Sequence, residues 1–541
     1  MNARKFITLL IFMFLCLIGV TGCSEQGEPY AKVPINKQQF VQLSVPNFQL
    51  QKKTVKKNSY FTLVKDTSYE FAIVHKRETV GKLSVTTRHL DNGDVFLFTK
   101  LQNDTKEPLN AEVSIHLKEV NRYHLIDWDQ RFKKQEHHKT TGVDETTYPM
   151  GLVKAFSYDK EKYNLVLSKN YLSRELVKKY EDDRKSIVRE LIKEEKAFSA
   201  NVKGDSLSFV LPLQSTGNDI SENWMLFSKE KLFKNDQHLQ QWINEQIDNY
   251  KRANSWLTAE GPYTKLPWSI EPGTKKGYGR NLGIMQDQMS LDYFEQYKDR
   301  YFYDLVLNSA ANLLAYKQTK GTKLWETEYT STWLKKAYGT TAPYMDTRHN
   351  EYIALFLTKV GKLLNIDELT KAETIYGDYL VQQVKIGNII QVKEGYLIAD
   401  YFSPYNQSKK THTSMNHILG GVNILLHCYM STGDKKYLDV ALNIRKGIEE
   451  LGDQWIRDSG DLWYQVNPDL TFTGNDYEQL TLIDLLMTQE NFEKAGIHRS
   501  KTLDKLIRSK AGYLVREKKQ LYPYVIEMLT SQGFKDVLLQ K

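Results

Sequence analysis

The spacing of apolar residues changes near residue 235, and this change constrains the fold more than any other feature of the sequence. Residues 47–230 show the alternation that is typical of half-buried strands, as on either side of the turn at Asp91-Asn92-Gly93. Beyond residue 235 the apolar residues recur every three or four positions, starting with Leu239 and Trp242. The sequence therefore predicts an α+β protein, with a β-sandwich-like domain over 47–230 and helices after it.

Two stretches interrupt this division. Residues 173–197 are highly charged, and we expect a helix there, solvated on one side, as an excursion from the β-rich domain. Residues 231–265 carry the first helical spacing and are expected to form a linker helix between the two domains.

The helical segments over 266–541 come in pairs. One helix is expected between Asp299 and Gly321, and Asp434 is the expected N-cap of another. Further helices are predicted over 322–337, 347–365 and 367–386 and along an apolar stripe over 415–429, and a last pair of helices over 475–508. Because each antiparallel pair has to bury its apolar faces against the next pair, we expect an incomplete α/α toroid of about four hairpins.

Tyrosines recur in the segments that lead into successive helix pairs. Tyr278, Tyr344, Tyr405 and Tyr464 follow one another at intervals of roughly 60 residues, the length of two helices with their loops. A toroid places such segments on one rim, so the four tyrosines are expected at one shared site. The alternative is that each of them only caps a hydrophobic core.

The N-terminus has the features of a secretory signal. Arg4 and Lys5 precede an apolar run over 6–18, and Val20-Thr21-Gly22-Cys23 follows it. This end resembles a bacterial lipobox, which implies cleavage after residue 22 and lipid on Cys23. The alternative is an uncleaved transmembrane anchor, although the apolar run is short for a span.

The lipobox resemblance implies a protein held at the cell membrane and facing outside the cytoplasm. The polar residues 23–46 then suit a flexible tether. Cys428 is the remaining cysteine after Cys16 leaves with the signal and Cys23 carries lipid, so we expect no intramolecular disulfide and a small core residue at Cys428.

The net charge and the composition indicate which kinds of partner the protein can bind. The formal net charge is +8, and losing Arg4 and Lys5 with residues 1–22 leaves +6. This excess is not gathered into a lysine- and arginine-rich block with interleaved aromatic residues, so nucleic acid is not an expected partner. The chain has 33 tyrosines, whose flat apolar faces and hydroxyl groups suit sugar surfaces.

Three stretches carry a resemblance to a known family. They are "HTSMNHILGGVNILLHCYMSTGDKKYLDVALNIRKGIEEL", "RDSGDLWYQV" and "GNDYEQLTLIDLL". The order of their features along the chain is similar to the order found in the C-terminal domain of D-glucuronyl C5-epimerases. The matching features are Met415-Asn416-His417 at a helix start, an acidic-glycine turn over 458–461, Tyr464, and Asp476-Tyr477 before the next helix.

The resemblance implies proton transfer at C5 of a uronate residue in an acidic polysaccharide. Such an enzyme neutralises the carboxylate, removes the C5 proton with a base and returns a proton from the opposite face. It implies Tyr464, Tyr477 and Tyr405 as acid–base groups, with a nearby cation lowering the tyrosine pKa. The expected substrate-binding residues are Arg280, Arg348, His412, His417, Asn416, Asn467, Tyr344 and Tyr278. No cofactor is expected.

This sequence departs from the family at two positions. Asn467 stands three residues after Tyr464, where the family has an arginine, and Pro404 stands before Tyr405, where the family has a glutamate. Asn467 can hydrogen-bond to a substrate but cannot neutralise its charge. The carboxylate clamp and one acid–base group therefore differ from those of the family.

Other functions stay open at this point. A lyase shares the first half of the reaction and then expels the substituent at C4. A glycoside hydrolase needs two carboxyl groups across a cleft, and Asp346, Asp400 and Asp476 are the candidates. A non-catalytic glycan-binding protein of the cell envelope is the third possibility. No metal site is expected, because His412 and His417 lie five residues apart rather than four.

Overall fold

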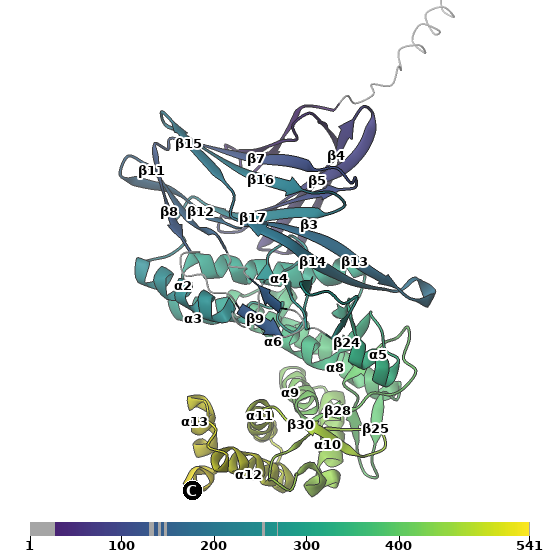
Figure 1. Ribbon diagram of the computed structural model, residues 1–541. Helices are drawn as coiled ribbons and strands as arrows, with labels where there is room; N and C mark the ends of the chain where they lie inside the picture. The colour runs from purple at the N-terminus through teal and green to yellow at the C-terminus, as the bar shows by residue number, and fades with distance from the viewer. Residues whose placement is uncertain are drawn as a thin grey trace, which may run out of the picture.

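The N-terminal half consists of antiparallel β-sheets, seen in a computed structural model that describes residues 27–128, 135–138, 142–144, 149–250, 255–267 and 269–539 (Figure 1). One sheet has the order β1-β2-β7-β16-β15, and the other runs β18-β19-β21-β14-β13-β17-β6-β5-β4-β3 with β12, β11 and β8 beside β17. The two sheets share one apolar core that includes Val33, Leu97 and Phe209, as the two sheets of a sandwich do.

The bounds of the strands in this half are as follows: β1 Tyr30–Pro34, β2 Phe40–Ser44, β3 Gln49–Phe61, β4 Val64–His75, β5 Glu78–Leu90, β6 Val95–Asn103, β7 Leu109–Lys118, β8 Arg122–Asp127, β9 Gln135–His138, β10 Gly142–Asp144, β11 Gly151–Ser157, β12 Lys160–Leu167, β13 Asn170–Lys179, β14 Lys185–Glu195, β15 Ser199–Lys203, β16 Ser206–Ser215, β17 Ile220–Ser228, β18 Ser255–Trp256, β19 Tyr263–Lys265 and β21 Gly277–Gly279. The expected hairpin around Asp91-Asn92-Gly93 is confirmed by the pairing of β5 with β6.

The helix expected over 173–197 is wrong. This stretch belongs to the hairpin of β13 and β14, joined through a 3-10 turn over Glu181–Asp183. In β14 the buried side chains include Ser186 and Val188, which are two residues apart and face the same side. Most of the charges are exposed or half-buried, although Arg189 is buried, and their number concealed the strand alternation.

The tether expected over 23–46 is also shorter than predicted, because β1 and β2 lie within it. β2 pairs with β7 of the sandwich, and Val33, Val41 and Leu43 are fully buried. These apolar residues alternate with polar ones, as in a half-buried strand. The lysine, glutamine and proline between them made the segment resemble a polar linker in the sequence.

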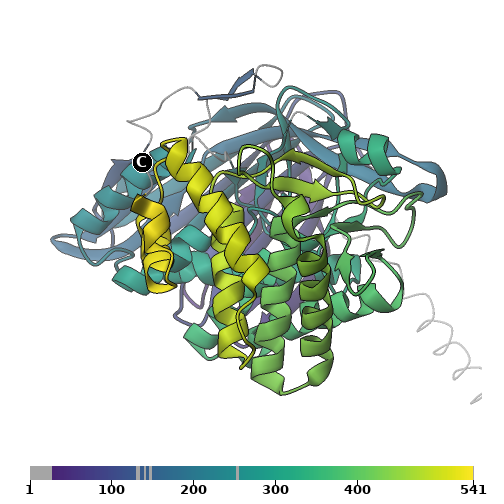
Figure 2. The ribbon, with the colours of Figure 1, turned by 90° about the horizontal axis from the view of Figure 1, so that it is seen from below.

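The helices of the C-terminal half form two rows. In one row α4, α6, α9 and α11 each contact the next, and in the other row α8, α10 and α12 do the same. Figure 2 shows the helices of the C-terminal third, coloured green to yellow, side by side. The helices are α2 Asp236–Tyr250, α3 Gln288–Tyr297, α4 Arg300–Lys320, α5 Thr332–Tyr338, α6 Thr347–Leu364, α7 Asp367–Thr370, α8 Ala372–Lys385, α9 Met415–Thr432, α10 Lys435–Leu451, α11 Leu480–Lys494, α12 Lys501–Arg516 and α13 Pro523–Ser531, with 3-10 turns at Gly452–Trp455 and Lys535–Leu539.

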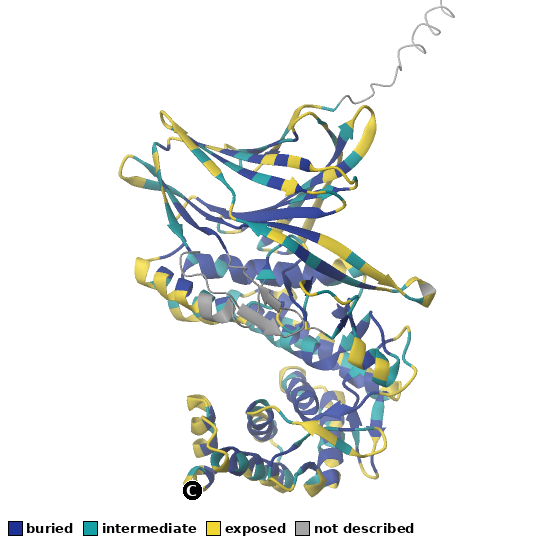
Figure 3. Ribbon diagram, viewed as in Figure 1, coloured by how far each residue is buried: buried dark blue, intermediate teal, exposed yellow. Residues whose placement is uncertain are grey.

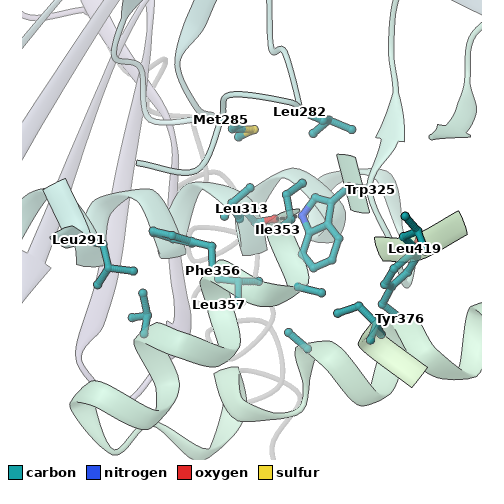
Figure 4. Close-up of a cluster of buried hydrophobic side chains, with 14 of the residues drawn as sticks. Leu282, Met285, Leu291, Leu313, Trp325, Ile353, Phe356, Leu357, Tyr376 and Leu419 are labelled. Atoms are coloured by element: carbon teal, nitrogen blue, oxygen red, sulfur yellow. Dashed lines mark hydrogen bonds between the residues drawn. The ribbon is translucent and has the colours of Figure 1, made fainter. Parts of the chain in front are cut away.

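The first row is the buried one. α9 is buried on nearly all sides, whereas α10 and α12 bury one face (Figure 3), which is how apolar and amphipathic helices differ. Figure 4 shows the packing between α4 and its neighbours, where the Trp325 indole donates a hydrogen bond to the Leu313 carbonyl at 2.7 Å. Cys428 lies in this core, as predicted.

Most predicted helix bounds are confirmed. Asp299 and Gly321 flank α4, and Asp434 caps α10 by accepting a hydrogen bond from the Lys436 amide. The helix expected over 322–337 is confirmed only at its end, in α5. The residues before it form two short strands, β22 Glu326–Thr327 and β23 Thr330–Ser331, whose buried polar side chains do not give a helical apolar face.

A buried arginine joins the two halves. Arg88 of β5 is fully buried and binds the Asp66 carboxylate through two nitrogens, at 2.8 and 2.9 Å. Its third nitrogen donates to the side-chain oxygens of Asn308 and Asn312 in α4, both at 2.6 Å. One guanidinium therefore fixes α4 against the sheet.

Arg88→Met should destabilise the protein strongly, because it leaves Asp66 buried without its counter-charge. We expect the free energy of unfolding to fall by about 3–5 kcal/mol in urea titrations. The matched control is Arg122→Met, which removes an arginine that is 58% exposed and pairs with an exposed aspartate, and it should change stability by less than about 1 kcal/mol. Equal effects of the two changes would contradict this role of Arg88.

Candidate functional site

Short strands tie together the segments that lead into α6, α9 and α11. β24 Tyr344–Asp346 precedes α6 and pairs with β27 Tyr401–Phe402. β28 Thr413–Ser414 precedes α9 and pairs with β29 Trp463–Val466, which in turn pairs with β30 Phe472–Asn475 ahead of α11. Segments that are distant in the sequence are thus joined by backbone hydrogen bonds at the N-terminal ends of the three helices.

The carboxylate of Asp400 lies at the centre of this region. It is fully buried and accepts hydrogen bonds from the Ser414 amide, at 2.9 Å, and from the Ser414 hydroxyl. The Nε2 atom of His412 lies 3.2 Å from one carboxylate oxygen, and the Nδ1 atom of His417 lies 3.6 Å from the other. The Asp400 carbonyl also accepts from the Thr347 amide at 3.0 Å, so this residue contacts the starts of both α6 and α9.

Charge and burial set the protonation of the cluster. Burial favours the neutral acid at Asp400, but the two histidines and Ser414 outweigh it and lower its pKa. Burial lowers the pKa of His417 more than the negative charge of Asp400 raises it. At neutral pH the cluster therefore holds an ionised Asp400 beside a neutral His417, which is able to accept a proton.

Each histidine has a second partner. The Nδ1 atom of His412 lies 2.9 Å from the Tyr338 hydroxyl, and the Nδ1 atom of His417 lies 2.8 Å from the Thr347 hydroxyl. The His412 side chain is 1% exposed and that of His417 is 7% exposed. His417 is thus the member of the pair that is nearer to solvent.

Aromatic rings cover the cluster. The Tyr401 ring lies 5.8 Å from His412 and 6.0 Å from His417 between ring centroids, and Tyr464 lies 6.3 Å from His412. Outside them are Trp333, 5.5 Å from His412, and Tyr477, 5.6 Å from Tyr464. Trp333 and Tyr477 are about half exposed, at 47% and 51%, so the wall runs from the buried histidines to the surface.

The structure brings together several residues that the sequence placed at one site. Tyr344, His412, His417, Tyr464 and Tyr477 belong to the cluster or to the rings around it, and Tyr344 contacts Tyr401 at 6.0 Å. Asn416 is buried at the start of α9.

Three other predicted residues have different surroundings. Tyr278 is fully buried in a separate cluster of the β-sheet with Trp256 and Tyr263, so the prediction that it contacts substrate is wrong. Tyr405 is 51% exposed, with its hydroxyl 3.4 Å from Glu326. Asn467 lies in the turn of the β29–β30 hairpin and hydrogen-bonds to Thr471 and Thr473.

The two arginines expected to hold a substrate carboxylate are engaged with protein carboxylates. Arg280 makes two hydrogen bonds to Glu328, at 2.5 and 2.8 Å. Arg348 binds Glu351 and Asp484, both at 2.9 Å, and is 7% exposed. Both guanidinium charges are thus paired within the protein, although the buried Nε atom of Arg348 has no hydrogen-bond partner among the described residues. Neither arginine is therefore the unpaired cation that the expected clamp requires.

Tyr464 is not activated as a base. Burial and the neighbouring Asp400 charge raise the pKa of Tyr464 above its usual value. This differs from the expectation of a cation that lowers the pKa, because the negative carboxylate is the nearer charge. Tyr464 therefore stays protonated at neutral pH and can donate a proton, whereas His417 is the group able to accept one.

The three aspartates proposed for a hydrolase are held by protein groups. Asp346 caps α6 by accepting from the His349 amide at 3.0 Å. Asp476 pairs with Lys510 at 2.8 Å and accepts from the Thr481 hydroxyl at 2.6 Å. Together with the burial of Asp400, these contacts do not place a pair of carboxyl groups across an open cleft.

Sequence reasoning missed Trp333, Tyr338 and Tyr401. Tyr401 follows Asp400 directly in the sequence, so its place beside the candidate aspartate was a usable signal. Trp333 and Tyr338 lie in α5, which was expected to be a longer helix packed on its neighbour, and its short length hid their role.

The described residues hold no group of three histidine, cysteine, aspartate or glutamate side chains arranged to bind a metal ion. Among the helices of the described chain, none has the length and apolar character needed to cross a membrane.

Comparisons with known proteins give distant matches. No family model matches the chain, and no curated protein matches it. A family 76 glycoside hydrolase from a bovine Bacteroides thetaiotaomicron strain is 11% identical over 78% of this chain and 75% of its own, with a TM-score of 0.34. An unsaturated glucuronyl hydrolase from Bacillus sp. GL1 is 10% identical over 50% of this chain and 77% of its own, with a TM-score of 0.29.

A sugar epimerase from a ruminal bacterium is also similar, at 12% identity over 38% of this chain and 51% of its own, with a TM-score of 0.29. With TM-scores this low, the likenesses say nothing about substrate, which has to be inferred from the side chains.

His417→Gln should flatten the dependence of stability on pH. In the folded protein burial lowers the His417 pKa, whereas in the unfolded chain histidine titrates at about 6.5. The native protein therefore loses stability as the pH falls below about 6.5 toward the folded pKa. Urea unfolding at two pH values either side of this point measures the loss.

The control is His498→Gln, in the described loop between α11 and α12, for which we expect the wild-type pH dependence. The account of His417 is contradicted if His417→Gln loses as much stability on acidification as the wild type does.

Proposed function

We propose that this protein acts on an acidic polysaccharide by proton transfer at C5 of a uronate, as the D-glucuronyl C5-epimerases do. The observation that supports the proposal is the pair of histidines on Asp400, beneath a wall of aromatic rings that reaches the surface. We further propose that the two helix rows form an incomplete α/α toroid, with this site at its rim.

The side chains suit distinct roles in such a reaction. His417, neutral and the more exposed of the two histidines, takes the proton from C5. Tyr464, protonated, returns its hydroxyl proton to C5 from another direction. The phenolate that this leaves is reprotonated when His417 releases the proton it took, which restores both groups. Asp400 stabilises the positive charge that forms on His417 while it keeps its hydrogen bond from the Ser414 amide. Trp333 and Tyr477 offer flat faces against which a sugar ring can stack.

The substrate carboxylate has to be bound by a group other than the two paired arginines. His412 lies between Asp400 and Tyr338 and contacts the rings of Trp333 and Tyr464. It is the group proposed to donate a hydrogen bond to that carboxylate.

We also propose the location. The N-terminal residues 1–22 act as a signal, Cys23 carries lipid, and the body lies outside the cytoplasmic membrane of a bacterium, where envelope polysaccharides are accessible.

A second function is favoured by the state of the arginines. Because Arg280 and Arg348 are both bound to protein carboxylates, the protein can instead be a glycan-binding protein of the envelope without catalytic activity. The aromatic wall is then the whole site.

Hydrogen exchange at C5 tests the proposed reaction. The protein is incubated with uronate polymers in deuterated water, and deuterium at C5 is measured by NMR. We expect exchange by the wild type, with a loss of about 100-fold or more in His417→Gln and in Tyr464→Phe, since one acid–base group contributes 10²–10⁴-fold. His498→Gln is the matched control and should exchange at the wild-type rate.

Other products identify the alternatives. An unsaturated sugar end shows a lyase, and new reducing ends show a hydrolase. Polymer binding without exchange of the C5 hydrogen overturns the catalytic proposal and leaves the glycan-binding protein.

A further inference from the structure

The described chain joins the β-sandwich almost at once after the proposed lipid site. Glu28 bridges to Leu50 through two backbone hydrogen bonds, at 2.8 and 3.0 Å. Five peptide units separate Cys23 from Glu28, and fully extended chain spans at most about 18 Å over that number. A lipid on Cys23 would therefore hold this end of the sandwich within that distance of the headgroups.

Strand β3, which starts beside this point, is basic and lies at the edge of the large sheet. Its lysines at 52, 53, 56 and 57 are all exposed, and the strand contains no acidic residue. An edge strand with several lysines is protected from pairing with other strands. Lys52 and Lys53, close to Gln49, also make the anchored end of this strand complementary to an anionic surface.

The β4–β5 turn adds two more cations at the same end. Gln49 is opposite Val74 in the sheet, and the turn residues Lys76 and Arg77 follow at once. They adopt positive φ angles of 47° and 76°, where glycine and asparagine are favoured in a two-residue hairpin. Two exposed basic residues therefore occupy a turn whose backbone does not favour them.

A groove of about 420 Å³ opens between β1, β3 and β4. Lys32 and Lys52 line it together with Tyr30 and Tyr69, and the Lys32 ammonium lies 4.6 Å from the centre of the Phe40 ring. The acidic side chains near these cations are Glu28, which also lines the groove, Glu70 and Glu78. The basic residues outnumber them.

We propose that this basic edge rests on the anionic headgroups of the membrane that holds the lipid, with a headgroup phosphate seated between Lys32 and Lys52. The inference rests on the proposed lipidation of Cys23 and concerns a surface separate from the glycan site. β4 lies at one end of the molecule and α12 at the other (Figure 1), so the contact would turn the helical half and its site away from the bilayer.

Vesicle binding by the chain from residue 23 onward, with Cys23→Ser, tests this contact without help from the lipid. The vesicles are pure phosphatidylcholine or equal parts of phosphatidylglycerol and phosphatidylcholine. We expect cosedimentation with the anionic vesicles alone and release at high salt, because the attraction is screened. The quadruple variant K52Q/K53Q/K76Q/R77Q should bind at least about tenfold more weakly, since each basic residue near the surface contributes to the attraction.

The matched control changes four exposed lysines of the helical half, K435Q/K501Q/K518Q/K535Q. This variant keeps the basic edge and should bind the anionic vesicles as strongly as the protein without these changes. Equal loss in both variants would show a general charge effect and overturn the proposal, as would equal binding to both vesicle types. Binding of an anionic polysaccharide by this edge in place of vesicles would also overturn it.

Lipidation itself is tested separately. In bacterial cells the wild type should sediment with membranes, and Cys23→Ser should be released at high salt. If Cys23→Ser behaves as the wild type in cells, the proposed anchor fails, whereas the vesicle result still decides whether the edge binds anionic lipid.

Discussion

The buried carboxylate of Asp400 is the interaction on which the candidate site depends. Its contacts come from the backbone and hydroxyl of Ser414 and from two imidazoles. A buried charge is costly unless it is paired or hydrogen-bonded, so the surrounding groups have to keep their positions for the carboxylate to stay ionised. Those groups belong to the start of α9 and to the segment just before it, while the backbone carbonyl of Asp400 accepts a hydrogen bond from the Thr347 amide at the start of α6. Asp400 therefore links the starts of both helices.

The helical rows turn this local arrangement into a site. The buried row α4, α6, α9 and α11 puts the N-terminal ends of α6, α9 and α11 beside one another, and short strand pairs cross from each lead-in segment to the next. Aromatic residues fill the space between these strands and the surface. The same arrangement explains why Tyr464 has a raised pKa: it lies over a negative charge rather than beside a free arginine.

Periodicity predicted much of the fold because it reports directly which faces are buried. The helical spacing gave the bounds of α4 and α10 through Asp299, Gly321 and Asp434. It failed for the β13–β14 hairpin and for β1 and β2, where charged or polar residues between the buried positions hid the alternation.

The candidate site was predictable in part. Regular spacing of tyrosines placed Tyr344 and Tyr464 near each other, but it also included Tyr278, which is sealed in the sheet. The spacing says where a segment lies along the chain and nothing about which side its ring faces. The pairing of Arg280 with Glu328 and of Arg348 with Asp484 joins residues that are distant in the sequence, so only the folded chain shows it.

The central claim is that an ionised Asp400 lies beside a neutral His417. NMR of protein labelled at the imidazole nitrogens and the aspartate carboxyl carbon measures both protonation states directly at neutral pH. The account predicts an ionised carboxylate at Asp400 and an uncharged imidazole at His417, with the His417 signal titrating below the usual histidine range. A protonated Asp400, or a His417 that is already charged at neutral pH, would contradict it.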